Sequence, residues 1–459
     1  MSAGSDKPLR DIAARAVDAA LAAGATDAEA VVEDSRECTV RVYGGRVESL
    51  TEAGSRGLGV RAWIDGRVGY SYGSDLSDDG VARIAGGAVD AAAIADVDEF
   101  AAAPRIDGDP AEVPGLVSPS LIEASTEEKV ELAKAVEAAA SAAASRVRAV
   151  ETSVYADEIG RQAIVSSAGA DAEFEAGFAY AYTHAIATGQ GDERQTGLGF
   201  GLGRGPELLD PQAIGAEAAG RAEQLLGAEK PASRTVPVVL TPTVAASFLG
   251  FIGGVLGADA VQRGRSPFAS KLGERIGSGI VSLVDDGLDP EGMASAPVDG
   301  EGLARRRTTL IDGGVLSAFL HDSYTARREG GDAVSTANAA RSGYRSSPGV
   351  KASNLVLTPG GLSEDELVAA AGDGVYITDV AGLHSGVNPV TGQFSVGASG
   401  LLIENGRLAG PVSEFTIASD FVSLLLNIEA IGADPRWVPF GGSVKTPPLL
   451  ISRIAIAGT

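Results

Sequence analysis

The chain has 459 residues, enough for two or three domains, and its 44% hydrophobic and 21% charged residues are typical of an ordinary globular protein. Its net charge of −24 and its short basic stretches argue against direct nucleic-acid binding, because phosphate binding needs clustered lysine and arginine. The single cysteine, Cys38, excludes an internal disulfide and a cysteine-rich zinc site, which suits a reducing compartment.

The sequence favours a cytoplasmic protein without a membrane partner. The N-terminus, MSAGSDKPLRDIAARAV, lacks the basic-then-apolar order of a signal peptide. The uncharged run 235–258 is long enough to span a bilayer. However, Thr241 and Pro242 are typical of a helix cap and a first helical residue, placed directly after the short strand VPVVL.

The first segment, residues 1–97, is predicted to be a small α+β domain. Apolar residues recur at helical spacing over 9–21 and give that helix one apolar face. Two hairpins follow, with a Gly-Gly turn at 44–45 and an Asp-Gly turn at 65–66. A second helix is expected after Ser77, which is a favourable N-cap residue.

The middle segment, residues 98–234, is predicted to be a second α+β domain with a proline-rich lead-in. Ser125 and Glu128 form a capping-box pattern in front of a long helix. Antiparallel strands follow, and PQAIGAEAAGRAEQLLG closes the segment as a helix. The glycines of GFGLGRG lack the layout of a phosphate loop, so we interpret them as sites of close helix packing.

The third segment, residues 235–459, is predicted to be a β-rich C-terminal domain. Its initial strand, turn and helix are followed by short strands with glycine turns. A helix is expected over SDFVSLLLNIEAIG, residues 419–432, before a final strand in PPLLISRIAIAG. The three segments together predict an α+β fold.

Residues typical of catalysis are sparse. The chain has three histidines, and no two of them share a helix turn as zinc peptidase motifs require. No Gly-x-Ser-x-Gly elbow is present, and Cys38 has no setting that would lower its pKa. From the residues alone we therefore predict no catalytic side chain and no metal ligand.

The loop HSGVNPVTGQFS, residues 384–395, is the remaining candidate. Asn-Pro at 388–389 and Thr-Gly at 391–392 predict a simple β-turn. The same polar groups would also suit a loop that lines a cleft. The residues by themselves leave both interpretations open.

Several stretches, in order along the chain, resemble the TldD/TldE (PmbA) family. They are GATDAEAVVEDS, RVESLTEAGSRGLGVRAW, STANAARSGYRSSPGVKASNLVLTPG and GLHSGVNPVTGQFSVGASGLLIENGRLAGPVSEFTIAS. The resemblance covers nearly the whole chain and implies a cytoplasmic, dimeric metalloprotease. In that family the TldD side carries a His-Glu-x-x-x-His helix and a cysteine near the C-terminus as zinc ligands. The TldE side lacks them, and the two sides enclose a chamber for unfolded peptides.

The family's metal motif does not carry over to this chain. The matching helix, residues 243–260, has neither histidine nor glutamate. The stretch GADPRWVPFGGSVKTP occupies residues 432–447, where the cysteine would be. The chain thus resembles the TldE side, and zinc is expected in a TldD-like partner chain.

The resemblance implies a non-catalytic subunit of a heterodimeric zinc metalloprotease, which encloses unfolded peptides and presents them to its metal-bearing partner. The sequence leaves open whether the chain forms a homodimer without that partner. The loop would face the substrate or the partner through five polar residues: His384, Asn388, Thr391, Gln393 and Ser395. Two alternatives remain, namely a regulatory protein that binds gyrase or a toxin system, and a homodimeric hydrolase with unrecognised chemistry.

Overall fold

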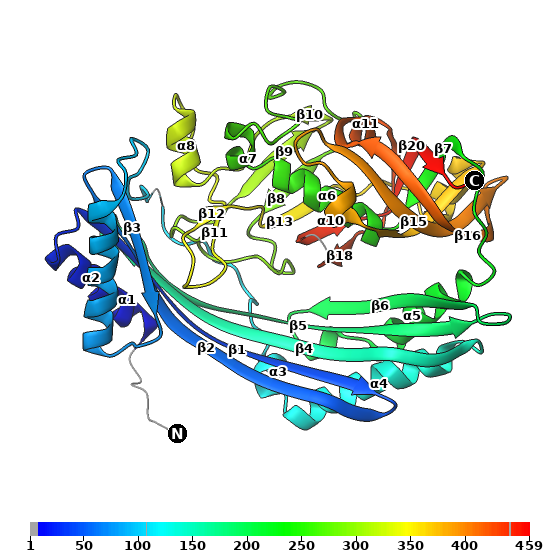
Figure 1. Ribbon diagram of the computed structural model, residues 1–459, viewed down its shortest axis with the longest axis horizontal. Helices are drawn as coiled ribbons and strands as arrows, with labels where there is room; N and C mark the ends of the chain where they lie inside the picture. Colours follow the sequence, from blue (N-terminus) through cyan, green and yellow to red (C-terminus); the bar gives the residue numbers. More distant parts are fainter. Residues whose placement is uncertain (1–7, 107, 440–441) are drawn as a thin grey trace.

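The structure is a computed structural model that describes residues 8–106, 108–439 and 442–459. A long curved antiparallel sheet, with helices on its convex side, faces a β-rich C-terminal body across its concave side (Figure 1). The chain therefore has the predicted α+β fold.

The curved sheet has the strand order β3-β2-β1-β4-β5-β6. Its strands are β1 (Asp27–Tyr43), β2 (Arg46–Ile64), β3 (Arg67–Gly73), β4 (Val147–Ser166), β5 (Asp171–Thr188) and β6 (Arg194–Gly203). The predicted turns at 44–45 and 65–66 are confirmed, and all four of their residues have positive φ. Strands from both sides of residue 97 thus share one sheet, while the division into domains at that residue stays a prediction.

Two pairs of helices cover the convex face of this sheet. Helices α1 (Leu9–Ala22) and α2 (Asp78–Ile94) pack on the beginning of β1 and the end of β2. Helices α4 (Thr126–Ala143) and α5 (Pro211–Gln224) pack on the other half. Two short elements complete this part of the chain, α3 (Pro119–Glu123) and the 3-10 turn η1 (Pro206–Leu208).

The predicted helix starts are confirmed in detail. The Ser77 hydroxyl accepts a hydrogen bond from the Gly80 amide at 3.2 Å, and Ser125 and Glu128 form a complete capping box. One assignment in α1 is wrong, because Leu21 is 36% exposed and does not belong to the buried face. It lies in the last turn of the helix, at the margin of the apolar stripe.

Glycine allows α5 to lie directly against β6. A Cβ atom at Gly197 would come within 2.1 Å of the Ala218 carbonyl oxygen, and one at Gly199 within 2.0 Å of the Ile214 carbonyl oxygen. The interpretation of GFGLGRG as a stretch of close helix packing is therefore confirmed at Gly199, and Gly197 just before it packs in the same way.

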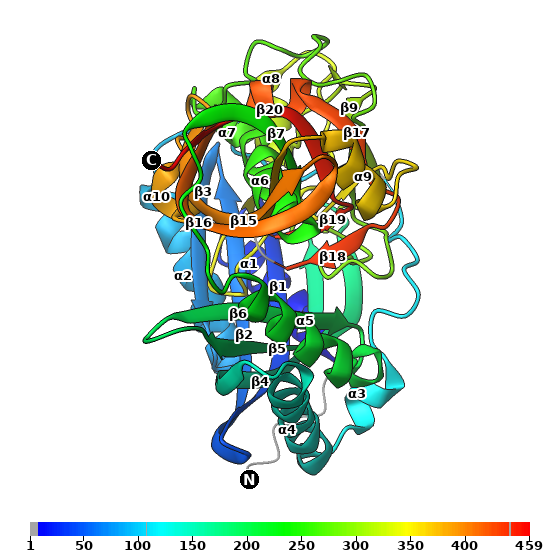
Figure 2. The ribbon, with the colours of Figure 1, turned by 90° about the vertical axis from the view of Figure 1, so that its right-hand side faces the viewer.

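The C-terminal body contains a closed barrel and a second sheet. The barrel sheet has the order β16-β15-β14-β7-β20-β17. An additional pairing of β16 with β20 closes five of these strands into a ring, which Figure 2 shows from one end. Its strands are β7 (Arg234–Leu240), β14 (Gly374–Ala381), β15 (Gln393–Glu404), β16 (Arg407–Asp420), β17 (Ile428–Ile431) and β20 (Leu449–Ala457).

The second sheet has the order β10-β9-β8-β13-β19-β18. Its strands are β8 (Leu283–Asp286), β9 (Arg307–Asp312), β10 (Val315–Leu316), β13 (Asn354–Leu357), β18 (Arg436–Val438) and β19 (Ser443–Thr446). A small ribbon is formed by β11 (Ala339–Ala340) and β12 (Gly349–Val350). The remaining helices are α7 (Ala258–Gln262), α8 (Ser323–Glu329), α9 (Glu364–Ala371), α10 (Leu383–Gly386) and α11 (Phe421–Leu426).

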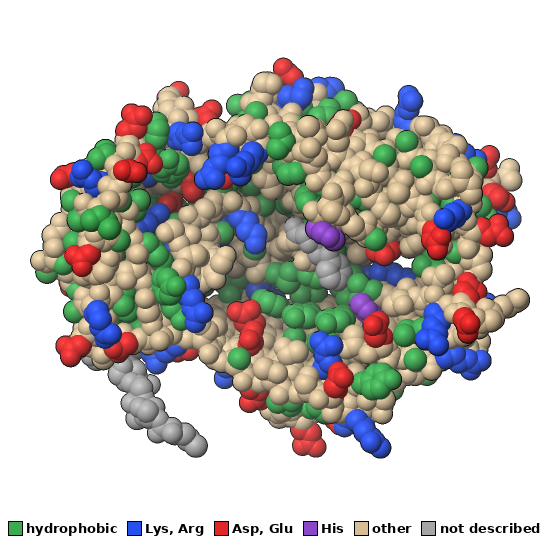
Figure 3. Space-filling model, in the orientation of Figure 1, with side chains coloured by type: hydrophobic (Ala, Val, Ile, Leu, Met, Phe, Trp, Pro, Cys, Tyr) green, Lys and Arg blue, Asp and Glu red, His purple; other side chains and the backbone are tan. Residues whose placement is uncertain are grey.

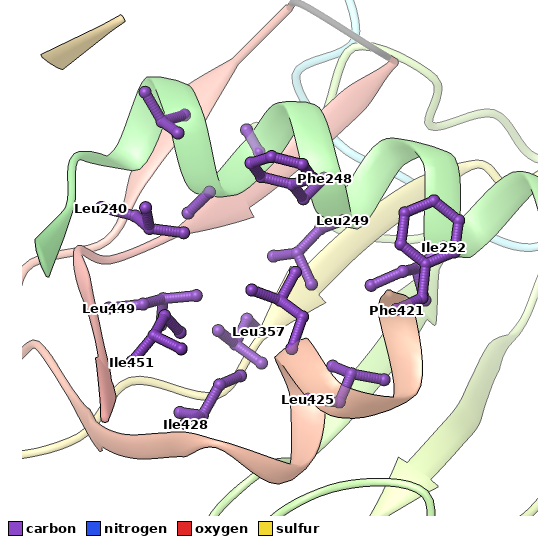
Figure 4. Packing of buried hydrophobic residues seen from close by; sticks show 14 of the residues in the cluster. Leu240, Phe248, Leu249, Ile252, Leu357, Phe421, Leu425, Ile428, Leu449 and Ile451 are labelled. Carbon is purple, nitrogen blue, oxygen red and sulfur yellow. The ribbon is translucent and has the colours of Figure 1, made fainter. Parts of the chain in front are cut away.

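Helix α6 (Pro242–Val255) lies at the centre of this body and confirms the predicted strand, turn and helix. Its Phe248 and Ile252 are buried against side chains from both sheets and from α11 (Figure 4). Thr241 is the N-cap residue, although its hydroxyl makes no capping hydrogen bond. Among the described residues, no helix combines the length and apolar character needed to cross a bilayer.

The helix predicted over 419–432 is wrong in its second half. Helix α11 ends at Leu426, and the chain then forms β17. Ile428 pairs with Ile451 and Ile431 pairs with Leu449 of β20. The isoleucines thus gain strand partners that come from a distant part of the sequence, and this pairing outweighs the helical spacing of the apolar residues.

Candidate functional site

The curved sheet and the C-terminal body enclose a hollow, and apolar side chains are visible inside it in Figure 3. A cavity of about 540 Å³ lies between the two parts. Its floor comes from β1, β2, β4 and β5, and its roof from the segment 341–345 and Met293 of the C-terminal body. The cavity is of a size that suits part of a bound ligand.

The strand register arranges the floor in rows that cross the sheet. One row consists of small residues, namely Ser55, Ser35, Gly160 and Ala176. A Cβ atom at Gly160 would meet only the Ser35 Cβ atom, at 3.8 Å. This row forms a shallow channel across four strands, which we call the trough.

Larger side chains line the trough on both sides. The row on one side is Glu33, Gln162 and Phe174. The row on the other side is Glu37, Glu158 and Phe178. Of these three, Glu158 and Phe178 line the cavity. The trough is therefore bounded by an aromatic ring and a carboxylate on each side.

Two of the carboxylates beside the trough, Glu33 and Glu158, have raised pKa values. Burial raises the pKa of Glu33, which accepts hydrogen bonds from the Tyr344 amide at 2.7 Å and the Gln162 side chain at 2.9 Å. Burial and the charges of Glu37 and Glu33 raise the pKa of Glu158. A cationic group placed here would relieve this mutual repulsion.

Aromatic residues continue from the trough along β5. The rings of Phe178 and Tyr180 are 6.3 Å apart between centroids, and those of Tyr180 and Tyr182 are 6.4 Å apart. His184 follows, 5.9 Å from Tyr182. The residues between them, Ala179, Ala181 and Thr183, are buried on the side of α4 and α5, so the rings share the concave face of the sheet. We call these four residues the aromatic ladder.

A buried group of ion pairs ties the sheet to the C-terminal body. The Arg61 Nη2 atom lies 2.8 Å from Glu29 and 3.1 Å from Glu301, while Arg341 binds the other oxygen of Glu29. Glu29 and Glu301 are only 1% and 2% exposed. We call these four residues the clasp. Because Arg341 begins the roof segment, the clasp also fixes the roof over the trough.

Glycine in β2 makes room for the roof. A Cβ atom at Gly57 would come within 2.2 Å of the Tyr344 ring, and one at Gly59 within 2.3 Å of the Tyr344 carbonyl oxygen. That carbonyl accepts a hydrogen bond from the Tyr70 hydroxyl at 2.7 Å. The roof segment therefore lies directly on the concave face of the sheet.

Asp299 lies beside the clasp, and the pKa of its carboxyl group is raised. Its carboxylate accepts hydrogen bonds from the backbone amides of Glu301 at 2.9 Å, Leu303 at 3.0 Å and Ala339 at 3.1 Å. Burial and the charge of Glu301 raise the pKa of Asp299 to about 7. The folded protein thus holds a proton here at pH values where the unfolded chain has lost it.

The loop 384–395 forms the predicted turn. The Asn388 carbonyl accepts from the Gly392 amide at 2.8 Å, and the Asn388 side-chain oxygen accepts from the amides of Val390 and Thr391 at 3.0 and 3.3 Å. The structure leaves all five predicted site residues exposed. Their role in binding a substrate or a partner stays a prediction.

Only part of this predicted set is brought together. Asn388, Gln393 and Ser395 line an open hollow of about 570 Å³. His384 on α10 and Thr391 at the turn are not among the residues that line it. The other two histidines lie elsewhere, with His184 on β5 and His321 buried next to α8.

Helix α6, where the resemblance predicts a metal-binding helix, presents glycine to a cavity of about 230 Å³. Gly250, Gly253 and Gly254 line this cavity together with Lys351 and residues of the neighbouring strands. None of its described lining residues is histidine, cysteine, aspartate or glutamate, and Lys351 adds positive charge. These residues do not fit a zinc ion, which needs imidazole, thiolate or carboxylate ligands.

The rest of the described chain also lacks a cluster that could hold a metal ion. Within residues 8–106, 108–439 and 442–459, no three or more His, Cys, Asp or Glu side chains gather as a metal site would require. The stretch 432–447 has no cysteine, and its residues Phe440 and Gly441 lie outside the described part of the chain. Cys38 is buried under α4, and burial raises the pKa of its thiol, as expected for a residue that only packs.

Sequence reasoning did not identify the trough. The motif FEAGFAYAYTH in β5, with rings or histidine at alternating positions, is a local signal for an aromatic face. The small residues of the trough come from four strands and give no signal until the register is known. The clasp was missed for the same reason.

Three family models match successive parts of the chain. They describe domain 1, the central domain and the C-terminal domain of the PmbA/TldA metallopeptidases, and match residues 28–92, 119–226 and 233–458. A protein of Escherichia coli O157:H7 named metalloprotease PmbA is 27% identical over 452 residues, which covers 98% of this chain and 97% of that protein.

Two crystal structures have the same fold. One, from Thermotoga maritima and described as a candidate modulator of a DNA gyrase, has a TM-score of 0.89 at 28% identity and covers 98% of this chain and 100% of its own. The other, TldE from Thermococcus kodakarensis, has a TM-score of 0.90 at 22% identity and covers 97% of this chain and 100% of its own. At that identity the second likeness concerns the fold alone.

Proposed function

The chain belongs to the PmbA/TldD metallopeptidase family, and on this basis we propose that it is the peptide-holding, metal-free subunit of a two-chain zinc peptidase. The observation that carries the proposal is the glycine face of α6. Where the resemblance implies a metal-binding helix, this chain presents Gly250, Gly253 and Gly254 beside Lys351.

The chemistry of peptide hydrolysis supports the proposal that a partner chain, and not this chain, provides the metal site. A zinc peptidase needs three protein ligands and a carboxylate base that converge on one water molecule. The glycines of α6 offer no ligand, and a lysine at the same cavity disfavours a dication. The metal and the base are therefore proposed to come from a TldD-like partner chain.

The contribution of this chain is then to hold the substrate. The cavity between the sheet and the roof has polar and aromatic groups that can bind an extended peptide. At the more open part of the surface, the loop 384–395 exposes amide, hydroxyl and imidazole groups for hydrogen bonds. We propose that His384, Asn388, Thr391, Gln393 and Ser395 contact the partner chain or the substrate without taking part in bond cleavage.

Native mass spectrometry with zinc analysis tests the proposal. This chain is measured alone and after mixing with a family member from the same genome that carries His-Glu-x-x-x-His. We expect a one-to-one complex with one zinc ion, and cleavage of an unfolded peptide by the mixture only. Chelation should abolish that cleavage.

Two results would contradict the proposal. One is stoichiometric zinc bound by this chain alone, which would require ligands that α6 does not provide. The other is peptide cleavage by this chain alone that survives chelation, which would indicate a hydrolase with a different mechanism.

A further inference from the structure

We infer that the trough is a side-chain pocket for an extended peptide, and that it selects a bulky apolar residue that has a basic residue two positions away. This inference relies on the proposed function only for the entry of peptides into the hollow. It adds the place where the peptide lies and the kind of sequence that binds.

The shape of the trough fits one large side chain. Phe174 and Phe178 bound it on β5, and they are four residues apart, or about 13 Å along an extended strand. Between them the floor has only Ala176, Gly160 and Ser35. An apolar side chain can therefore enter between the two rings and lose its contact with water.

The aromatic ladder sets the line and the phase of the peptide. Side chains on one face of an extended peptide repeat every two residues, or about 6.4–6.8 Å. The ladder rings repeat at 6.3 and 6.4 Å. A peptide that lies along β5 thus stays in phase with the ladder, so that a residue in the trough at Ala176 places its second neighbour over Phe178.

The carboxylates next to Phe178 favour a basic side chain at this second peptide position. Phe178 is the direct register partner of Glu158, and Glu158 is the partner of Glu37. A lysine or arginine over this row would bring its stem against the Phe178 ring and its charge to the two carboxylates. The nearby cations of the roof are already engaged, Arg341 with Glu29 and Arg345 with the Tyr344 ring and hydroxyl.

Fluorescence anisotropy with the full chain and three labelled octapeptides tests the inference. The peptides contain Lys-Ser-Leu-Ser-Lys, Lys-Ser-Ala-Ser-Lys or Glu-Ser-Leu-Ser-Glu at their centre and are otherwise identical, so that binding in either direction is tested. We expect the leucine-to-alanine and the lysine-to-glutamate changes each to weaken binding about tenfold. Both changes leave the peptide length and backbone the same.

Two variants locate the effects on the floor. Gly160→Val fills the trough and should remove the preference for leucine over alanine. Glu158→Gln should reduce the preference for lysine over glutamate and keep the preference for leucine. The matched control is Gly410→Val, which makes the same change in β16 at a position where a Cβ atom meets nothing within 4 Å. It should bind all three peptides as the original chain does.

Each outcome decides the question. A leucine preference that persists in Gly160→Val overturns the inference, and so does the absence of peptide binding by the original chain. If Gly160→Val does not fold, Ser35→Val fills the same trough from β1 and takes its place. Failure of this inference can be told apart from failure of the proposed function. Pairing with the metal-bearing relative is a separate measurement, and the chain can show the peptide preference even if that pairing does not occur.

Discussion

The clasp and the loop 384–395 are two parts of one molecule with opposite construction. In the clasp, four charged side chains from β1, β2 and the C-terminal body are buried together and satisfy one another. The loop makes most of its hydrogen bonds within its own turn and leaves its polar side chains exposed. Charge at the clasp therefore holds the fold together, whereas polarity at the loop is available for binding.

This difference indicates which substitutions can test function without loss of the fold. Removing one member of a buried ion pair leaves its partner charged and without solvent, which is costly. Removing an exposed side chain leaves only water in its place. Substitutions at the clasp should thus report on stability, and those at the loop on binding.

The largest expected effect is that of Arg341→Met, which keeps the length of the stem and removes the charge. Glu29 would keep Arg61 but lose its second cation, and we expect the free energy of unfolding to fall by about 3–5 kcal/mol. Urea denaturation measures this change. Arg83→Met is the control, since Arg83 is 69% exposed in its pair with Asp75 and should matter little. Equal losses in the two variants would remove the distinction between buried and exposed charge.

A smaller effect is expected from pH, because Asp299 has a pKa of about 7 in the folded state. Stability from this group is fully present below about pH 4, falls as the pH rises, and has been lost once the pH passes about 7. Asp299→Asn should remove this component, so the variant's stability should fall less than that of the original chain between pH 4 and 7.

Thermal melts at several pH values compare the two proteins. Asp18→Asn, an exposed change on α1, serves as the control and should keep the original pH profile. An Asp299→Asn profile parallel to the original would show that Asp299 titrates at its ordinary pKa.

The smallest effect on the fold is expected from His384→Ala. The side chain is exposed, so the melting temperature should stay unchanged, while pairing with the metal-bearing relative should weaken about two- to fivefold. Titration of the two chains measures this affinity, with Val390→Ala on the same loop as the comparison. If the His384→Ala complex lost all cleavage while keeping its zinc and its assembly, the non-catalytic assignment would be wrong.

The sequence predicts the local parts of this fold well, because their causes are local. The capping box at Ser125 and the turn at 44–45 depend on residues within a few positions. The segment 428–431 was misassigned because its conformation depends on β20, which follows in the chain. The spacing of apolar residues in one segment contains no information about the strand that will pair with it.

The candidate site shows the same limit more strongly. The turn at Asn388 was predicted from its own residues, and the structure confirms it. The trough needs Ser35 beside Gly160, two residues that are far apart in the sequence and meet only through the pairing of β1 with β4. Its residues are small and uncharged, so they carry no chemical signal before they are placed together.

The pairing of β7 with β20 has a consequence for biosynthesis. Thr235, near the start of the barrel, pairs with Ala455 in β20, the last of the barrel strands in chain order. On the ribosome the barrel therefore cannot close until β20 has emerged, while the curved sheet can already assemble once β6 has emerged. During that interval the apolar face of α6 and the unpaired strands have no cover, so nascent chains of this protein should depend on chaperones until β20 has paired.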